Sequence, residues 1–403
     1  MTTTINNEHK KLNVPNLRFK EFQGVWEETT FGDIATGFDY GMNAAAKIYD
    51  GENKYIRITD IDEASSTYNN KDIVSPDGIL SDNYLVNERD ILLARTGAST
   101  GKSYLYRKSD GKLYYAGFLI RANVTTHNPY FVFSQLHTHR YWRWVSIMSA
   151  RSGQPGINSQ EYSSFPIYTT SIQEEDKISK LLSLLDERIA TQSKVIEDLK
   201  KLKCAIIEKH YRQAKLHKYK ICDLGEPFSV GSLSKEDLSE EGNECILYGE
   251  LFTTYDCVIN KIKSHTNKIA NMTLSQKRDL LFPSSTTVDA VSLISPSVID
   301  LPNVILGGDM FGIHSDKKFN AYYLSYYINI IARKKLAIYA KGSTIIHLHY
   351  KDIAKAQLLL PDLCEQDRIA KCMMAEDDKI KVEEQLMTKL EEQKQYLLRQ
   401  MFI

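Results

Sequence analysis

The fold of this 403-residue chain depends most on residues 173–212, which read QEEDKISKLLSLLDERIATQSKVIEDLKKLKCAIIEKHYR. The stretch contains neither Gly nor Pro, so nothing in its forty residues interrupts a helix. Steps of four and three residues in alternation from Ile178 meet an apolar side chain at seven of ten positions, which is typical of a coiled-coil seam. At about 1.5 Å per residue such a helix would be roughly 60 Å long, more than one compact domain needs.

A second stretch at 364–403 repeats this pattern 191 residues further along the chain. The polar breaks in the seam also repeat, because Gln192 and Lys203 correspond to Glu383 and Lys394. We therefore expect two long helices whose apolar stripes bury each other. The alternative is two unrelated amphipathic helices, each belonging to its own domain. The predicted seam residues are Ile178, Leu182, Leu185, Ile189, Ile196, Leu199, Ile206, Ile369, Met373, Ile380, Met387, Leu390 and Leu397.

The repeat extends to the segments in front of both helices. Residues 55–61 correspond to residues 245–251, and apolar and polar residues alternate in both runs, as is typical of strands. Residues 89–93 correspond to residues 278–282. Each run is followed by a tract rich in Gly or hydroxyl residues, 95–101 in the first half and 283–287 in the second. We expect an α+β globule of about 150 residues in each half. The predicted divisions are a globule at 1–172, a long helix at 173–212, a second globule at 213–363 and a second long helix at 364–403, with 213–220 as a basic linker.

Charge and composition exclude several classes of protein. The 51 basic and 51 acidic residues cancel, and the surplus over 173–220 is only twelve bases against eight acids. A strong non-specific nucleic-acid binder usually carries a larger surplus. The six cysteines form no C-x-x-C pair, and no apolar run suits a signal peptide or a membrane span, so we expect a cytoplasmic protein.

The segments that approach catalytic or binding motifs are better explained as structural features. The tract 97–103 resembles a phosphate-binding loop but lacks its spacing, so a turn between strands explains it better. Residues 127–131 approach an amino-methyltransferase signature without its second Pro, and they suit a helix start capped by Asn128. The scattered histidines predict no metal site. Residues 139–144 mix cations with aromatic rings, and we favour core packing of Tyr141 and Trp144 over a nucleic-acid surface.

The chain resembles the specificity (S) subunits of type I restriction–modification systems over nearly its whole length. The resemblance rests on VPNLRFKEF at 14–22 followed by Trp26-Glu27, on GDI at 32–34, and on DILLARTG at 90–97. It also rests on the long helices after Glu174-Glu175 and Glu365-Gln366, and on the ending LLRQMFI at 397–403.

The resemblance implies a fold and a division of labour. Each globule would be a target-recognition domain that reads one half of a bipartite site in double-stranded DNA. The helices would pack antiparallel, hold the globules apart and dock two methyltransferase subunits, which bind S-adenosylmethionine. Restriction subunits with ATP and Mg would join in the full complex. The chain itself would hold no cofactor, no metal and no catalytic residue.

The side chains that contact DNA are hypotheses based on hydrogen-bonding capacity in loops. In the first half they are Arg57, Arg95, Thr96, Ser99, Lys102, Gln154 and Asn158. In the second half they are Tyr248, Lys261, Lys263, Ser284, Ser285, Lys341, Thr344 and His347.

An antiparallel helix pair with aligned ends also predicts that Lys203 faces the level of Glu376. Two other functions stay open at this point: a two-globule scaffold that binds no DNA, and a self-sufficient methyltransferase.

Overall fold

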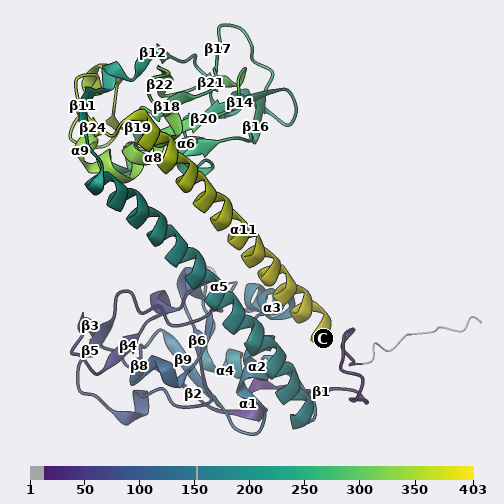
Figure 1. Ribbon diagram of the computed structural model, residues 1–403. Helices are drawn as coiled ribbons and strands as arrows, with labels where there is room; N and C mark the ends of the chain where they lie inside the picture. The colour runs from purple at the N-terminus through teal and green to yellow at the C-terminus, as the bar shows by residue number, and fades with distance from the viewer. Residues whose placement is uncertain (1–12, 151–152) are drawn as a thin grey trace, which may run out of the picture. The chain divides into compact units, whose positions relative to one another are not determined.

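The computed structural model describes residues 13–150 and 153–403 (Figure 1). The chain forms two compact units, Met1–Lys194 with Gln385–Ile403, and Val195–Glu384. Each unit contains one α+β globule and part of each of two long helices, α5 (Ile172–Gln213) and α11 (Leu363–Met401). All predicted site residues lie in the described part, while the start of the predicted first globule, residues 1–12, lies outside it.

The first globule is built on an antiparallel sheet in the order β2-β9-β6-β7. These strands are β2 (Ala35–Tyr40), β6 (Asp90–Ala94), β7 (Ser103–Leu105) and β9 (Leu119–Val124). Three two-stranded pairs complete its strands: β4 (Lys54–Ile56) with β8 (Leu113–Tyr115), β3 (Ala45–Ile48) with β5 (Val74–Asp77), and β1 (Glu27–Thr30) with β10 (Pro166–Thr169). The short α-helices are α1 (Phe31–Ile34), α2 (Pro129–Gln135), α3 (His139–Met148) and α4 (Ser159–Ser163).

Strand β6 is buried on both faces because its side chains alternate between two apolar cores. Ile91 and Leu93 pack with Tyr141 and other side chains of the helical layer. Leu92 packs on the opposite face with residues of β4 and β8. Tyr141 is fully buried and Trp144 is half-buried against the first core, which confirms the core packing predicted for residues 139–144.

The second globule contains two five-stranded sheets, in the orders β12-β22-β18-β20-β15 and β13-β16-β14-β21-β17. The first comprises β12 (Gly225–Ser229), β15 (Val258–Ile259), β18 (Asp279–Pro283), β20 (Ser297–Ile299) and β22 (Met310–Ser315). The second comprises β13 (Leu238–Ser239), β14 (Asn243–Leu247), β16 (Ser264–Thr266), β17 (Thr273–Leu274) and β21 (Ile305–Gly307). Two further pairs are β11 (His217–Lys220) with β24 (Gln357–Leu360), and β19 (Ser285–Thr286) with β23 (Ile346–His347).

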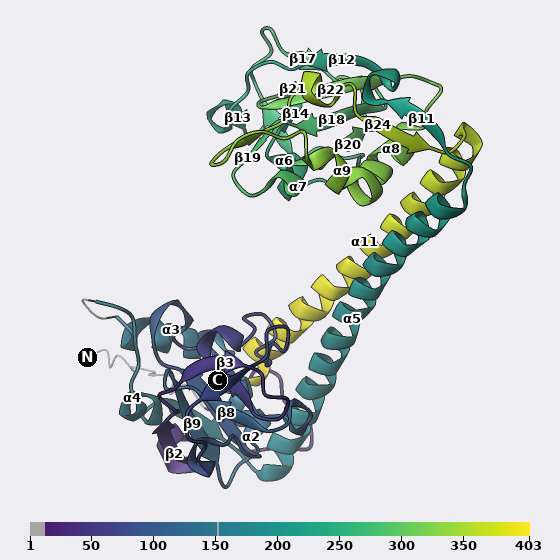
Figure 2. The ribbon, with the colours of Figure 1, turned by 90° about the vertical axis from the view of Figure 1, so that its left-hand side faces the viewer.

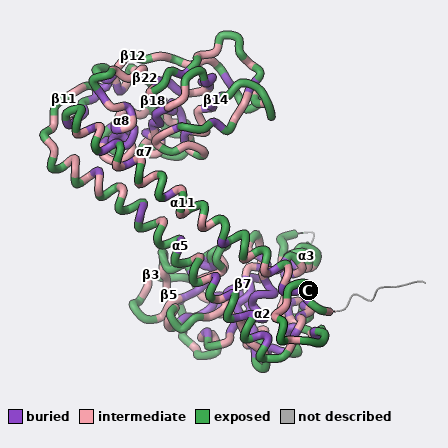
Figure 3. The backbone as a smooth tube through the Cα atoms, turned by 45° about the vertical axis from the view of Figure 1, so that its right-hand side comes forward, coloured by how far each residue is buried: buried purple, intermediate pink, exposed green. Residues whose placement is uncertain are grey.

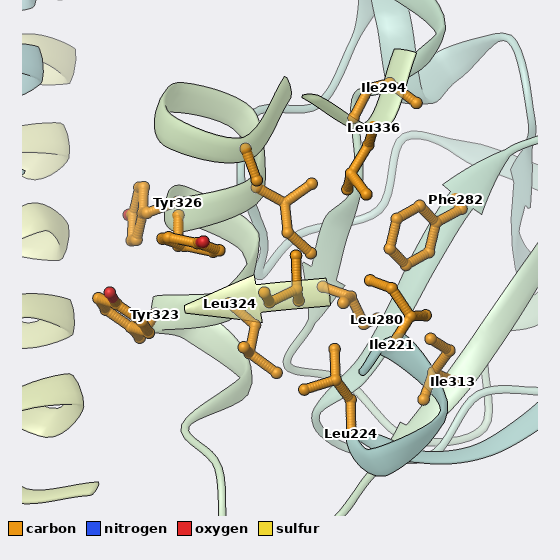
Figure 4. Packing of buried hydrophobic residues seen from close by; sticks show 14 of the residues in the cluster. Ile221, Leu224, Leu280, Phe282, Ile294, Ile313, Tyr323, Leu324, Tyr326 and Leu336 are labelled. Atoms are coloured by element: carbon orange, nitrogen blue, oxygen red, sulfur yellow. The ribbon is translucent and has the colours of Figure 1, made fainter. Parts of the chain in front are cut away.

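Aliphatic and aromatic side chains fill the space between the first of these sheets and its helices. The helices are α6 (Glu250–Thr253), α7 (Ala290–Leu293), α8 (Ala321–Tyr327), α9 (Arg333–Ala337) and α10 (Tyr350–Ile353). Figure 4 shows Leu280, Phe282 and Ile313 from the sheet meeting Leu324 and Leu336 from the helices. In Figure 3 the buried residues gather inside each globule and recur at intervals along α5 and α11.

The predicted internal repeat is present in the structure. Strands β2, β9 and β6 correspond to β12, β22 and β18, and the parallel pair β4–β8 corresponds to the parallel pair β14–β21. Arg89 and Arg278 repeat in detail, since both have a positive φ, +73° and +76°, and both donate hydrogen bonds to backbone carbonyls. The two globules are therefore variants of one scaffold.

The long helices α5 and α11 run antiparallel within each unit (Figure 2). In the first unit Ile178, near the start of α5, shares an apolar cluster with Leu398, near the end of α11. In the second unit Ile207, near the end of α5, shares a cluster with Ile369 and Met373, near the start of α11. All thirteen predicted seam residues are buried or half-buried. Ile207, Leu398 and Phe402 are buried helix or terminal residues absent from the predicted seam.

The two lysines that break the seam make matching contacts. Lys394 of α11 lies 2.7 Å from Oδ1 of Asp186 on α5, and the Tyr130 hydroxyl donates to the same carboxylate at 2.5 Å. In the second unit Lys203 of α5 binds Asp377 of α11, which also accepts a 2.5 Å hydrogen bond from the Tyr326 hydroxyl. Lys203 and Asp186 lie 191 positions before Lys394 and Asp377.

The ion pair of Lys203 corrects the predicted partner by one residue. We expected Glu376 at this level, whereas Asp377 forms the pair. On a helix adjacent residues point about 100° apart, so an estimate of level alone does not choose between them.

Two predicted strands end earlier than expected, and one predicted linker contains a strand. The strands predicted over 55–61 and 245–251 stop at Ile56 and Leu247, because the carboxylates of Asp60 and Glu250 accept the amides of Arg57 (2.9 Å) and Leu247 (2.8 Å) and turn the chain. The segment 213–220, predicted as a linker, contains strand β11, which pairs with β24 as β1 pairs with β10.

Candidate nucleic-acid interface

In the first globule the tract after β6 lies against the loop that precedes α4. The Gly97 amide donates to the Pro155 carbonyl at 2.9 Å, and the Ile157 amide donates to the Arg95 carbonyl at 2.9 Å. Thr96 and Gly156 form an isolated antiparallel bridge. These backbone contacts bring together five residues predicted to contact DNA: Arg95, Thr96, Ser99, Gln154 and Asn158.

A groove of about 670 Å³ opens beside this tract, and we call it groove 1. Its lining includes both predicted arginines of this region, Arg57 and Arg95, and three aromatic side chains, Tyr40, Tyr55 and Phe118. Tyr40 is 42% exposed and Phe118 is 59% exposed, so their rings are available to a ligand. Exposed rings beside cationic side chains are common on surfaces that bind nucleic acids.

The two arginines of groove 1 differ in their electrostatic state. Arg57 makes two 2.8 Å hydrogen bonds to the carboxylate of Asp60, which compensates its charge and raises its pKa. The guanidinium carbon of Arg95 instead lies 4.6 Å from the ring centre of Tyr40. The Ser159 amide donates to the Tyr40 hydroxyl at 3.3 Å. Hydrogen bonding by Ser159, from its side chain first and its amide second, lowers the pKa of Tyr40, and the charge of Arg95 lowers it further.

The other predicted residues of this half have mainly structural partners. Lys102 forms a 3.1 Å ion pair with Glu63. Asn158 caps α4 by accepting the Glu161 amide at 2.9 Å. Thr96 and Ser99 are half-buried, whereas Gln154 is exposed and lies against Gly97.

The second globule has a groove at the corresponding place, which we call groove 2. It also encloses about 670 Å³ and lies beside the pairing of Ser285 in β19 with His347 in β23. Tyr248, Ser285 and His347, all predicted to contact DNA, line it. The residues that complete its wall include Phe252, Thr286, Thr287, Asp309 and Arg333.

The remaining predicted residues of the second half lie around groove 2 or outside it. Ser284 is buried, and its carbonyl accepts the Leu348 amide at 2.8 Å. Lys341 binds Asp352 at 2.5 Å, and Thr344 is exposed in the loop between Lys341 and β23. Lys261 and Lys263 are exposed in the loop between β15 and β16, and neither lines the groove.

The two grooves share a position in the scaffold and differ in chemistry. Residues just after the first parallel strand line both, Thr59 after β4 and Tyr248 after β14. The tract after the buried strand also lines both, with Arg95 in groove 1 and Ser285 in groove 2. Arg333, the arginine of groove 2, donates to the carbonyls of Val291 and Ser292. Groove 1 therefore presents a cation over a ring, and groove 2 presents mainly hydroxyl and imidazole groups.

Sequence reasoning missed Tyr40 and Phe118 as groove residues. Tyr40 precedes Gly41 and Phe118 follows Gly117, and each Gly lies where two backbone segments approach closely. An aromatic residue beside a Gly at the end of a strand was the available signal. It does not separate an exposed ring from a core ring.

The described residues offer no metal site and no membrane span. No group of three or more His, Cys, Asp or Glu residues in 13–150 and 153–403 could hold a metal ion. Over the same residues, no helix is both long enough and apolar enough to cross a bilayer.

Comparisons with known proteins identify the family to which this repeated scaffold belongs. The family model described as the type I restriction modification DNA specificity domain matches the chain twice, over residues 25–201 and 215–392. The putative type I restriction enzyme MjaX specificity subunit of Methanocaldococcus jannaschii is 24% identical over 301 residues, covering 70% of this chain and 68% of that protein.

Two solved structures share the fold at 14% identity. One is the S subunit of a type I restriction–modification system from M. genitalium, with a TM-score of 0.63 over 97% of this chain and 99% of that chain. The other comes from work on complex assembly and conformational transition of a type I system, with a TM-score of 0.55 over 94% and 97%.

The double match defines the class of protein: a scaffold with two specificity domains. The chain belongs to the family of type I restriction–modification DNA specificity subunits. Subunits of this family choose the target and carry no catalytic residues of their own, as the resemblance implied.

Proposed function

We propose that this chain reads a split DNA target through its two grooves, one half-site per globule, for a type I restriction–modification complex. The observation that carries the proposal is the pair of corresponding grooves on one repeated scaffold, each with different side chains. A duplicated scaffold with unlike linings suits a target with two unlike halves. Linking two weak readers also raises their joint affinity, because the second contact becomes intramolecular.

The helix pair α5–α11 would set the distance between the half-sites and dock two methyltransferase subunits. Half-sites in DNA must match both the separation and the helical phase of the protein that reads them. S-adenosylmethionine would bind the methyltransferase subunits, while restriction subunits would bring ATP and Mg. The complex would act in the cytoplasm, where its DNA substrate lies.

The neutral net charge supports a division of phosphate contacts between subunits. DNA affinity depends steeply on salt when many cations neutralise phosphates, and this chain has no cationic surplus. We expect the chain alone to bind DNA weakly and the complex with its methyltransferase subunit to bind tightly. Tight, salt-resistant binding by the isolated chain would reject this division.

Methylome sequencing tests the proposal as a whole. Cells that express this chain with its methyltransferase partner should acquire adenine methylation at one split, asymmetric motif. Neither a DNA-free scaffold nor a self-sufficient methyltransferase is favoured by the family match. Methylation that needs no partner would support the latter, and absence of any new motif would reject DNA reading.

A further inference from the structure

We propose that Arg95 is the side chain through which the first globule selects a guanine in its half-site. The proposal rests on the proposed function and deepens it, because it names the base that groove 1 reads and the residue that reads it.

The guanidinium of Arg95 is held against the ring of Tyr40, but its N–H donors have no acceptor among the described residues. Among the described residues, no carboxylate or carbonyl accepts a hydrogen bond from its side chain. Its only described side-chain partner is the ring of Tyr40, at 4.6 Å from the guanidinium carbon to the ring centre. Stacking on a ring orients the planar group and leaves its N–H edge free for a ligand.

The surroundings hold this arrangement from several directions. The Arg95 amide donates to the Phe118 carbonyl at 3.0 Å, and the Arg95 carbonyl accepts the Ile157 amide at 2.9 Å. The Tyr40 hydroxyl accepts the Ser159 amide at 3.3 Å. A side chain ordered before binding loses less entropy when it binds, so its contacts discriminate more sharply.

The other cations near the two grooves are already engaged. Arg57 shares groove 1, but Asp60 takes its N–H edge in two 2.8 Å hydrogen bonds. The residue that corresponds to Arg95 in the second globule is Ser284, which is buried. Among the described lining of both grooves, Arg95 is therefore the arginine with an open edge.

Guanine is the base that fits such a group. Its major-groove edge presents two acceptors, N7 and O6, to which arginine donates in a bidentate contact. A good bidentate pair discriminates against other bases by about 1–3 kcal/mol, which corresponds to about 5- to 150-fold.

The test uses the complex of this chain with its methyltransferase subunit. The wild-type motif is first read from the methylome, and methylation rates are then measured on duplexes with each base pair replaced in turn. We expect one G·C pair in one half-site whose replacement slows wild-type methylation about 5- to 150-fold. In Arg95→Gln that penalty should disappear, while the penalties in the other half-site stay unchanged.

Two further variants make the result decisive. Arg143→Gln removes the same charge from the exposed side of α3 in the same globule and should keep every wild-type penalty. Arg95→Lys retains the charge without the fork, so it should reduce the guanine penalty even if Arg95→Gln fails to assemble. Arg95→Gln and Arg95→Lys variants whose penalties match those of the wild type, or fall equally in both half-sites, would overturn the proposal. A wild-type complex that methylates no split motif would instead reject the proposed function.

Discussion

Gly41 is the residue at which the first globule leaves least room for a side chain. A Cβ atom built there would lie 2.2 Å from the Ala116 carbonyl oxygen, closer than any real contact. We therefore expect Gly41→Ala to lower the free energy of unfolding of the first unit by about 1–3 kcal/mol through forced backbone displacement.

Tryptophan fluorescence measures this change, because Trp26, Trp142 and Trp144 all lie in the first unit. Gly153→Ala is the control, since a Cβ atom there meets nothing within 4 Å. Equal stability of the two variants would contradict the close approach at Gly41.

His137 gives the first unit a pH dependence. Burial lowers its pKa to about 4, and its ring nitrogens contact the Phe133 carbonyl and the Ser66 hydroxyl, both at 3.0 Å. Below the ordinary pKa of about 6.5, the unfolded chain binds a proton that the folded chain refuses. Stability should therefore be full above about pH 6.5 and fall towards pH 4, by at most about 3 kcal/mol.

Denaturant unfolding followed by tryptophan fluorescence at pH 7 and pH 5 checks this dependence. His137→Asn should flatten the difference between the two conditions, whereas replacement of the exposed His139 by Asn should not. A wild-type protein equally stable at both values would show that His137 does not resist protonation.

At the scale of elements, we expect the largely buried ion pair Lys203–Asp377 to stabilise the helix pair more than the exposed pair Lys200–Glu384 does. The side chains of Lys203 and Asp377 are 14% and 18% exposed, against 57% and 46% for the pair Lys200–Glu384 on the same helices. Lys203→Ala leaves a carboxylate largely buried, so we expect a loss of about 1–3 kcal/mol. Lys200→Ala should cost less than about 0.5 kcal/mol.

A double-mutant cycle measured by far-ultraviolet circular dichroism separates the pair from its surroundings. Restoration of stability when Lys203→Asp is combined with Asp377→Lys would identify the ion pair as the source. If the exchange restores nothing, the lysine acts through packing instead.

Sequence periodicity predicted the long elements and failed at short-range details. The helices were evident because forty residues without Gly or Pro leave few alternatives, and their ends fall within two residues of prediction. Two predicted strands stop early, at Ile56 and Leu247, because in each case a carboxylate accepts a hydrogen bond from a backbone amide three residues before it. Strand β11 looked like a linker because its HKYK sequence has no apolar alternation, and β24 alone supplies its pairing.

At the scale of the whole molecule, repetition in the sequence carried the prediction furthest. Two halves with the same order of motifs predicted two globules of one design, and the structure confirms both. The groove linings could not be read as reliably, because they are the surfaces on which the halves differ. Arg95 was predicted as a DNA-contacting residue from its loop position. Tyr40 and Phe118 were recognised as groove residues only from the fold, which places them in the same groove as Arg95.

The helix pair should affect how often DNA is modified without affecting which half-sites are chosen. Ile189 is half-buried in the seam, so Ile189→Asp places a carboxylate among apolar side chains and should loosen the pair. We expect lower methylation and restriction at an unchanged pair of half-sites. Ser193→Asp adds the same charge at an exposed position of α5 and should have little effect. Full activity of Ile189→Asp would contradict the spacer role.

The most direct test of two independent readers is the methylated motif of two variants, one for each groove. Arg95→Gln and His347→Ala are expressed separately with the methyltransferase subunit, and each motif is compared with that of the wild type. We expect Arg95→Gln to relax a base in one half-site only and His347→Ala to affect only the other half-site. Changes from both variants in the same half-site would show that the two globules are not independent readers.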